Sequence, residues 1–197
     1  MGHDYQECPL SLSIIYARSQ NHCIGKQGRV PWQLPAEYAS FDAITRGHAI
    51  IMGRRSYEDH HCALPERLNI VISRQPDYPV VDGVMLADSL ETALAHAQQQ
   101  SRRAFVIGGA DLILASMPRA MAVFETVVDT HIDGDTFLPP QDFAQFNHQT
   151  LLQHLPDAIH EYGFTVNCYR RVPRVSPYQK RQGRPLDWHP IEHGSES

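Results

Sequence analysis

Glu37 is the residue of this sequence whose surroundings most suggest chemistry. It follows the segment VPWQLPA, and if Pro35 begins a helix, Glu37 lies in its first turn with Phe41 one turn further along the same face. One interpretation is ordinary: the carboxylate complements the positive end of the helix dipole and points to solvent. Trp32, the two prolines and the long preceding loop favour another, in which a lid covers the carboxylate. A covered carboxylate can bind a ligand through two charge-assisted N–H bonds.

Three arginines indicate a binding site for an anion. Arg54 and Arg55 follow Gly53 at the start of a predicted helix, where their charges oppose the helix dipole at a cost of a few tenths of a kcal/mol each. Their position makes sense if an anion also binds the N–H groups of that helix. Arg74 follows the next predicted strand, and the carboxyl ends of parallel strands share one edge of a sheet, where nucleotides bind. The alternative is a solvated basic turn.

Gly108 and Gly109 join a predicted strand to a predicted helix. Glycines at such a junction allow the backbone to approach a diphosphate closely. The segment is not a G-x-G-x-x-G motif, however, and taken alone it indicates a tight turn.

The histidines and acidic residues do not predict a metal site, although the chain contains 12 His. His60, His61 and Cys62 are adjacent, so they do not project to one side of a helix, and no H-x-x-x-H or C-x-x-C motif supports them. The acidic segment 129–139 does not have the spacing of a calcium-binding EF-hand loop and is interpreted as a strand that ends in a solvated turn.

An alternating α/β frame must position these groups. The expected strands are 10–17, 49–52, 68–73, 84–87 and 104–107, and the expected helices are 35–47, a short one after 53, 88–99 and 109–116. Three further strands, at 123–132, 147–154 and 164–171, follow without intervening helices. The pattern predicts a parallel sheet that gains antiparallel strands at its C-terminal end. Residues 18–34 form a long polar loop, and such loops are often functional.

Composition limits the class of protein. The chain has 197 residues, 42% of them hydrophobic and 20% charged, which predicts one globular domain. Its net charge of −5 argues against a dedicated nucleic-acid binder. The cysteines, at positions 8, 23, 62 and 168, form no metal or disulfide pattern and indicate a reducing compartment. Because no secretory signal and no apolar run long enough to span a bilayer is present, we expect a cytoplasmic protein without membrane partners.

Six segments, taken in order, resemble the dihydrofolate reductase family: ARSQNHCIG, VPWQLPAEYASF, IIMGRRSYE, LPERLNIVISR, FVIGGADLI and VVDTHIDGDTFLP. The resemblance implies an α/β fold, a mostly parallel eight-stranded sheet flanked by helices, with a C-terminal antiparallel hairpin. It divides the chain into an N-terminal extension (1–9), a catalytic domain (10–171) and a Pro-rich C-terminal extension (172–197).

The resemblance also implies roles for individual residues. Glu37 would bind the pterin ring, with Trp32 and Thr130 completing the catalytic set, and Thr130 would orient the carboxylate. The substrate-binding residues would be Ala17, Glu37, Phe41, Leu64, Arg67 and Thr130, with Arg67 binding the glutamate of folate. The cofactor-binding residues would be Ala17, Ile24, Gly53, Arg54, Arg55, Ser56, Ser73, Arg74, Ile107, Gly108, Gly109, Ala110 and Asp111. Tyr38, His60, Ala110 and Ile113 depart from the residues common in the family.

The implied reaction is hydride transfer from NADPH to C6 of 7,8-dihydrofolate with protonation at N5, which gives tetrahydrofolate for one-carbon metabolism. Antifolate inhibitors are implied ligands, and no metal is implied. We expect a monomer, with a dimer through the C-terminal extension as the alternative.

Two other functions fit parts of the pattern. A reductase of the riboflavin pathway shares the fold and NADPH, but its ribityl phosphate substrate needs no arginine for a glutamate, so Trp32, Glu37, Phe41 and Arg67 favour folate. A non-catalytic binding module could retain the fold, but the retained Glu37, Thr130 and phosphate-binding residues argue against it.

Overall fold

The computed structural model describes residues 10–172, so the predicted extensions 1–9 and 173–197 lie outside the described residues. The strands are β1 (Ser11–Ser19), β2 (Cys23–Gly25), β3 (Ala49–Gly53), β4 (Leu68–Ile72), β5 (Val84–Ala87), β6 (Arg103–Gly108), β7 (Ala122–Val128), β8 (Thr136–Phe137), β9 (Phe146–His154) and β10 (Phe164–Arg171). The helices are α1 (Pro35–Thr45), α2 (Arg54–His60), α3 (Leu90–Gln100) and α4 (Ala110–Ser116), followed by a 3₁₀ turn at Met117–Arg119.

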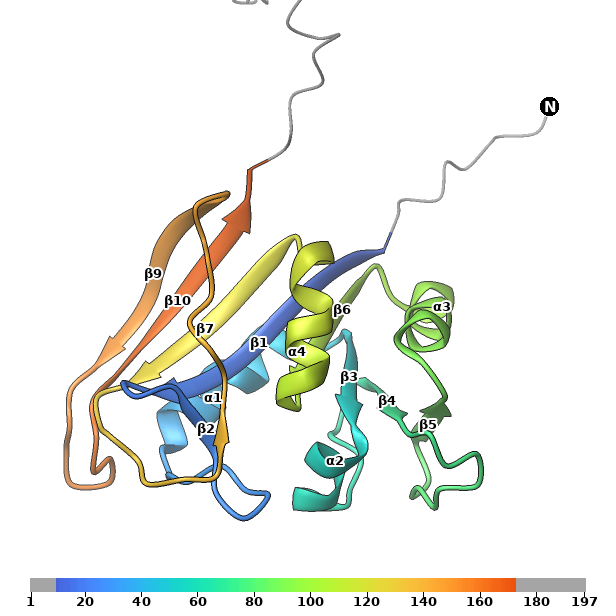
Figure 1. The fold of residues 1–197 in the computed structure, drawn as a ribbon, viewed down its shortest axis with the longest axis horizontal. Helices are drawn as coiled ribbons and strands as arrows, with labels where there is room; N and C mark the ends of the chain where they lie inside the picture. Colours follow the sequence, from blue (N-terminus) through green and yellow to red (C-terminus); the bar gives the residue numbers. More distant parts are fainter. Residues whose placement is uncertain (1–9, 173–197) are drawn as a thin grey trace, which may run out of the picture.

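Eight strands form one sheet in the order β5-β4-β3-β6-β1-β7-β10-β9 (Figure 1). The pairings from β5 to β7 are parallel, and β10 is antiparallel to both β7 and β9. The predicted fold, a mostly parallel sheet with a C-terminal antiparallel hairpin, is therefore confirmed. No helix between residues 10 and 172 has the length and apolar character needed to cross a membrane.

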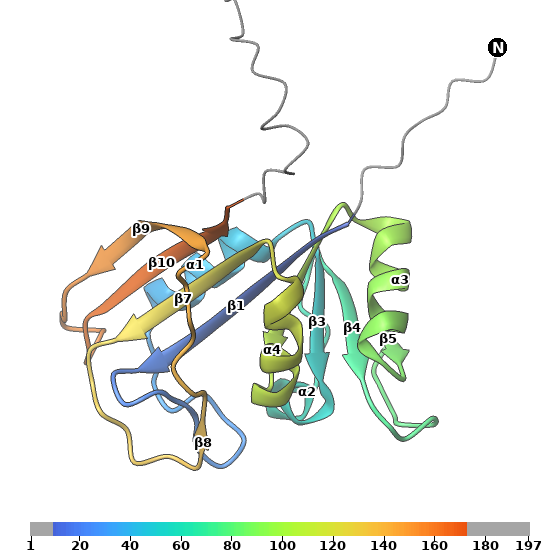
Figure 2. The same cartoon turned by 45° about the horizontal axis from the view of Figure 1, so that its top comes forward.

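Alternation along the central strands builds a core on each face of the sheet. In β3, Ala49 and Ile51 join the core beneath α3 and α4, whereas Ile50 and Met52 join the core that includes Tyr57 of α2. Figure 2 shows α3 and α4 together on one face of the sheet, with α1 on the other. Because parallel strands are buried on both faces, they appear in the sequence as continuous apolar runs, which is why they were predictable.

The sequence prediction was wrong at the end of β7 and within the loop 18–34. β7 ends at Val128 instead of continuing to residue 132, because its antiparallel pairing stops where Val128 meets Phe164, the first residue of β10. In the loop, Cys23 and Gly25 of β2 pair with Phe137 and Thr136 of β8. Strands of three and two residues are too short to show a period of two.

A buried ion pair connects β1 and β7. The Nε of Arg18 donates to Oε1 of Glu125 at 2.7 Å, and the Tyr16 hydroxyl donates to the same oxygen at 2.9 Å. The side chains of Arg18 and Glu125 are 17% and 6% exposed. The Tyr16 hydroxyl has its pKa raised, first by burial and then by the nearby Glu125 charge, so it stays a donor. The cluster therefore joins the two strands by hydrogen bonds that need the Glu125 carboxylate.

Glu125→Ala should destabilise the fold by about 3–5 kcal/mol, because it leaves the Arg18 guanidinium without its buried partner. The matched control is Glu91→Ala, which removes an exposed carboxylate paired with Arg119 and should cost less than about 1 kcal/mol. Urea unfolding measures both. Equal small losses would contradict a role for the Glu125 pair in holding β1 to β7.

Candidate active site

Two adjoining cavities lie where the turns after β3 and β6 meet. The first, here called the carboxylate pocket, has a volume of about 640 Å³ and includes Glu37, Phe41, Ser56 and Ile107 in its wall. The second, here called the arginine cleft, has a volume of about 750 Å³ and includes Arg55 and residues of the β6–α4 turn. Helix α2 contributes to both cavities, and Ile107 at the end of β6 lines the first while Gly109, two residues later, lines the second, so ligands in the two cavities would be close neighbours.

Pro35 begins α1, as predicted, and places Glu37 in the first turn of the helix. The carboxylate faces the largely apolar carboxylate pocket rather than open solvent. Burial raises the pKa of Glu37, and a hydrogen bond from the Thr126 hydroxyl opposes this rise. The ordinary interpretation of Glu37, a solvated residue that only complements the helix dipole, is therefore wrong.

The hydroxyl beside Glu37 belongs to Thr126 and not to the predicted Thr130, which is a correction of the sequence prediction. Thr126 pairs with Ala17 in the β1–β7 register, and both face the carboxylate pocket side of the sheet. Beyond the end of β7, the Thr130 N–H donates to the Val128 carbonyl at 2.8 Å in a tight turn. The Thr130 hydroxyl contacts Tyr162 instead. The family resemblance had assigned this role to Thr130, which lies two residues beyond Val128, the last residue of β7.

Several predicted residues do line the carboxylate pocket. Those expected for substrate or catalysis are Ala17, Trp32, Glu37, Phe41 and Leu64, and two expected for cofactor, Ser56 and Ile107, lie in the same wall. The departures Tyr38 and His60 also line it. Ile15, Asp59 and Cys62 were missed as site residues, although strand alternation could have found Ile15, two positions before Ala17.

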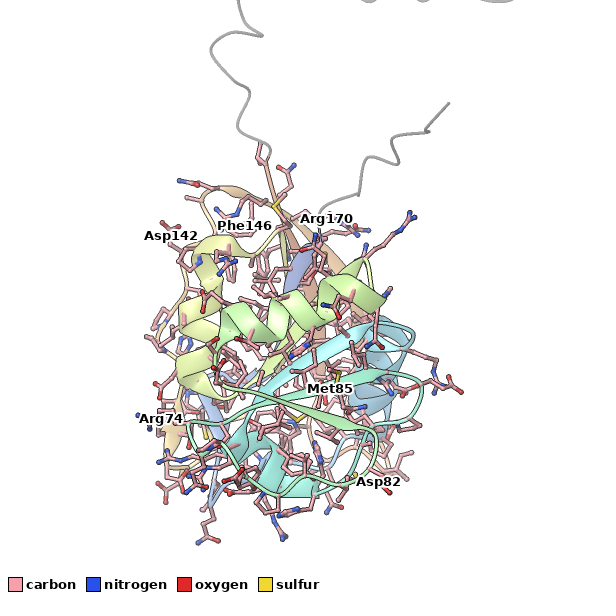
Figure 3. The ribbon with its side chains drawn as sticks, turned by 90° about the vertical axis from the view of Figure 1, so that its right-hand side faces the viewer. Arg74, Asp82, Met85, Asp142, Phe146 and Arg170 are labelled. Atoms are coloured by element: carbon pink, nitrogen blue, oxygen red, sulfur yellow. The ribbon has the colours of Figure 1, made fainter. Side chains whose placement is uncertain are left out.

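The arginine cleft contains most of the predicted cofactor residues. They are Gly53, Arg54, Arg55, Ser73, Arg74, Gly109, Ala110 and Asp111. Arg55 and Arg74 are exposed and form no ion pair within residues 10–172, whereas Arg54 bonds to Glu58 at 3.1 Å. Figure 3 shows Arg74 at the rim of the molecule, far from Arg170. The sequence missed Asp135, Thr136 and Phe137, which β8 brings to this cleft.

The glycine pair packs tightly against α2. Gly108 has φ +150°, and a Cβ added there would lie 2.8 Å from the Ser56 hydroxyl oxygen. A Cβ added at Gly53 would lie 3.6 Å from the Gly109 nitrogen. Glycine therefore allows the two turns to meet at the floor of the arginine cleft. Ile24 was predicted as a cofactor contact, but it packs against the core beneath α3 and α4, as does Ile113, and lines neither cavity.

Arg67 lies beyond the wall of the carboxylate pocket. Its side chain is only 1% exposed, and its guanidinium bonds to Asp42, Thr45 and Pro65. The guanidinium lies 5.9 Å from the centre of the Phe41 ring, so it sits just behind a residue of the pocket. Local sequence pattern cannot indicate the Asp42 partner, because it lies 25 positions before Arg67 in the chain.

The start of α1 is held by a residue from the β9–β10 turn that the sequence prediction missed. His160 accepts a hydrogen bond at Nε2 from the Ala36 N–H at 3.0 Å, and its Nδ1 lies 2.8 Å from Asp157 Oδ1. These bonds fit the neutral ring with its proton on Nδ1. His154, Asp157 and His160 lie close enough to bind a cation, but both nitrogens of His160 are already used. The group therefore positions the helix that carries Glu37.

Comparisons with known proteins place these features in a family. The family model described as "Dihydrofolate reductase" matches residues 11–171. Dihydrofolate reductase type 3 of Salmonella typhimurium is 39% identical over 140 residues, which cover 71% of this chain and 84% of that protein. Dihydrofolate reductase of Neisseria meningitidis serogroup A is 41% identical over 134 residues, covering 68% and 82%. A solved structure, dihydrofolate reductase from Enterococcus faecalis complexed with NADP(H) and RAB-propyl, superposes with a TM-score of 0.76 at 28% identity, covering 82% of this chain and 96% of that one.

Thr126→Val should raise the pKa of Glu37 further above its ordinary value, because the ionised carboxylate loses its hydroxyl donor while burial remains. Thr130→Val is the matched control and should leave that pKa unchanged. The ¹³C shift of glutamate side-chain carboxyls, followed against pH and assigned with Glu37→Gln, measures it. A shift caused by Thr130→Val alone would restore the original assignment.

Proposed function

The chain belongs to the dihydrofolate reductase family and reduces dihydrofolate with NADPH, and we propose that Glu37 binds and orients the pterin ring in the carboxylate pocket. The observation that carries this assignment is a carboxylate held by α1 in an apolar pocket, with Thr126 as its donor. The matched family is preferred over a riboflavin-pathway reductase and over a binding module that lacks catalysis.

The chemistry of the pterin ring fits this carboxylate. The ring has an amino group beside a ring N–H, and a carboxylate can accept a bidentate, charge-assisted pair from them. Because burial raises the pKa of Glu37, its negative charge is best stabilised when such donors arrive. The pair would fix the ring orientation, and Phe41 and Leu64 would pack against the benzoyl portion of the substrate.

The arginine cleft fits the cofactor. Arg55 and Arg74 would hold the 2′-phosphate, since both are exposed there. The turn at Gly108 and Gly109, where a Cβ at Gly108 would lie 2.8 Å from the Ser56 hydroxyl oxygen, would accept the diphosphate. When bound, NADPH supplies the hydride.

The remaining residues of the pocket would control water and the proton. Trp32 is buried, and its indole N–H has no hydrogen-bond partner within residues 10–172, so it can donate to the substrate or to a water. By holding the ring, Glu37 would favour the species protonated at N5, with a water as the immediate proton donor. The segment carrying Val30 would close over the nicotinamide and exclude water.

The loop that would act as a lid is tied to neighbouring segments. The Asn21 side chain bonds to both the N–H and the carbonyl of Ile132 at 3.0 Å. The Gln27 N–H donates to Asp135 at 2.6 Å, and Arg29 lies 3.6 Å from Asp59 at the pocket rim. These polar contacts can break and re-form, which suits a segment that opens for product release.

Several wider features belong to the same proposal. Residues 10–171 would form the catalytic domain. The cytoplasm would be its location, since Cys23, Cys62 and Cys168 are free thiols among the described residues. The net charge of −5 argues against nucleic-acid partners. The preferred state is a monomer, and the alternative dimer would form through the C-terminal extension, which lies outside the described residues.

Glu37→Gln should slow hydride transfer near neutral pH by about 100-fold or more, because the amide cannot hold the pterin through a charged pair. NADPH affinity should stay nearly unchanged, since Glu37 lies outside the arginine cleft. Single-turnover kinetics and NADPH titration measure the two effects. Asp59→Asn, a change at an exposed carboxylate on the same pocket, is the control and should alter the rate less than about threefold. An unchanged single-turnover rate for Glu37→Gln would refute the assignment.

Arg55→Ala should weaken NADPH binding by about 10- to 100-fold and NADH binding much less, because only NADPH carries the 2′-phosphate. Arg54→Ala is the matched control, and its NADPH loss should be smaller because Arg54 is already paired with Glu58. Fluorescence titration with both cofactors measures the ratio. Equal losses for NADPH and NADH would mean that Arg55 does not contact the 2′-phosphate.

A further inference from the structure

The guanidinium of Arg67 is enclosed by partners from its own chain. Its Nε donates to the Thr45 hydroxyl at 2.9 Å, and its other nitrogens donate to the carbonyls of Pro65 and Asp42 at 2.6 and 3.1 Å. Among the described residues, the only charged partner of Arg67 is the Asp42 carboxylate, which lies 2.5 Å away. Since the Arg67 side chain is 1% exposed, no carboxylate of a ligand can reach it while Asp42 stays in place.

Arg67 nevertheless stands where an acidic substrate tail would end. Phe41 and Leu64 line the carboxylate pocket, and the Arg67 guanidinium lies 5.9 Å from the Phe41 ring. The loop between Leu64 and Arg67 is fixed by Asn69, whose side chain bonds to the backbone of both residues. A ligand that extends past Phe41 and Leu64 therefore arrives at Arg67.

Asp42 has a second arginine to bind if it leaves Arg67. Its Oδ2 accepts from Arg46 Nε at 3.1 Å and from a terminal Arg46 nitrogen at 2.5 Å, while Arg67 contacts Oδ1. Arg46 also pairs with Glu66, and both are exposed. The two arginines lower the pKa of Asp42, so its carboxylate stays ionised. The carboxylate can thus turn toward Arg46 without losing all of its charged contacts.

We propose that Asp42 is a specificity-determining residue that competes with the acidic tail of the substrate for Arg67. This inference rests on the proposed function. Binding of a glutamate tail exchanges one carboxylate for another on the same guanidinium, so the tail adds little affinity. The enzyme consequently favours acidic-tailed pterins over neutral-tailed ones less than an uncovered Arg67 would allow.

Steady-state kinetics of Asp42→Asn and Asp42→Ala test the proposal with two substrates, dihydrofolate and 6-methyl-7,8-dihydropterin, which has no acidic tail. We expect the KM for dihydrofolate to fall by about tenfold in both variants, because Arg67 gains a free charged face. The KM and kcat for the neutral pterin should stay unchanged, which also shows that the variants fold.

Glu66→Gln is the matched control, since it removes a nearby negative charge that contacts Arg46 but not Arg67. It should lower the KM for dihydrofolate by less than about twofold, because exposed charges are screened. An equal effect of Glu66→Gln would mean that the general field, and not competition, is responsible. A KM for dihydrofolate that is unchanged or raised in the Asp42 variants overturns the inference, whereas wild-type protein that turns over neither pterin contradicts the proposed function itself.

Discussion

The parallel pairing of β1 with β7 is the contact on which the site depends. Tyr16 lies opposite Glu125 and Ala17 lies opposite Thr126. Because side chains alternate between the faces of a sheet, Ala17 and Thr126 face the carboxylate pocket while Tyr16 and Glu125 point to the other side. A slip of one residue would exchange the faces, placing a buried charge in the pocket and removing the donor to Glu37. The ion pair of Arg18 with Glu125 therefore stabilises the β1–β7 register from the face of the sheet opposite the carboxylate pocket.

Glu37 needs a second constraint, because it is on a helix and not in the sheet. No side chain of its own element caps α1, which begins at a proline. Instead, His160 from the β9–β10 turn accepts the Ala36 N–H, directly before Glu37 in the chain. The antiparallel hairpin at the edge of the sheet thus fixes the helix start, while β7 supplies the hydroxyl on the other side of the carboxylate. Two distant segments meet at one residue.

The sequence predicted what depends on local pattern and failed where contacts are long-range. Apolar runs located the buried strands, and the Pro35 start placed Glu37 correctly. The hydroxyl partner was misplaced because the family resemblance assigned the role to Thr130, whereas the register of β7 against β1 places Thr126 beside Ala17. Only the pairing of Val128 with Phe164 shows where the strand stops. The contact of His160 with Ala36 spans 124 positions, and no periodicity reports it.

The arginines show why residue type alone does not decide a role. Arg18 and Arg67 are largely buried and have carboxylate partners within the chain, Glu125 and Asp42. Arg55 and Arg74 are exposed in a cleft and have no such partner within residues 10–172. A buried arginine without a carboxylate would cost several kcal/mol of desolvation, so the fold supplies one. An exposed arginine has no such requirement, and its charge remains available to an incoming anion. The net charge of −5 is therefore compatible with a phosphate-binding cleft. Where an anion binds depends more on which arginines are exposed and lack a carboxylate partner than on the net charge of the chain.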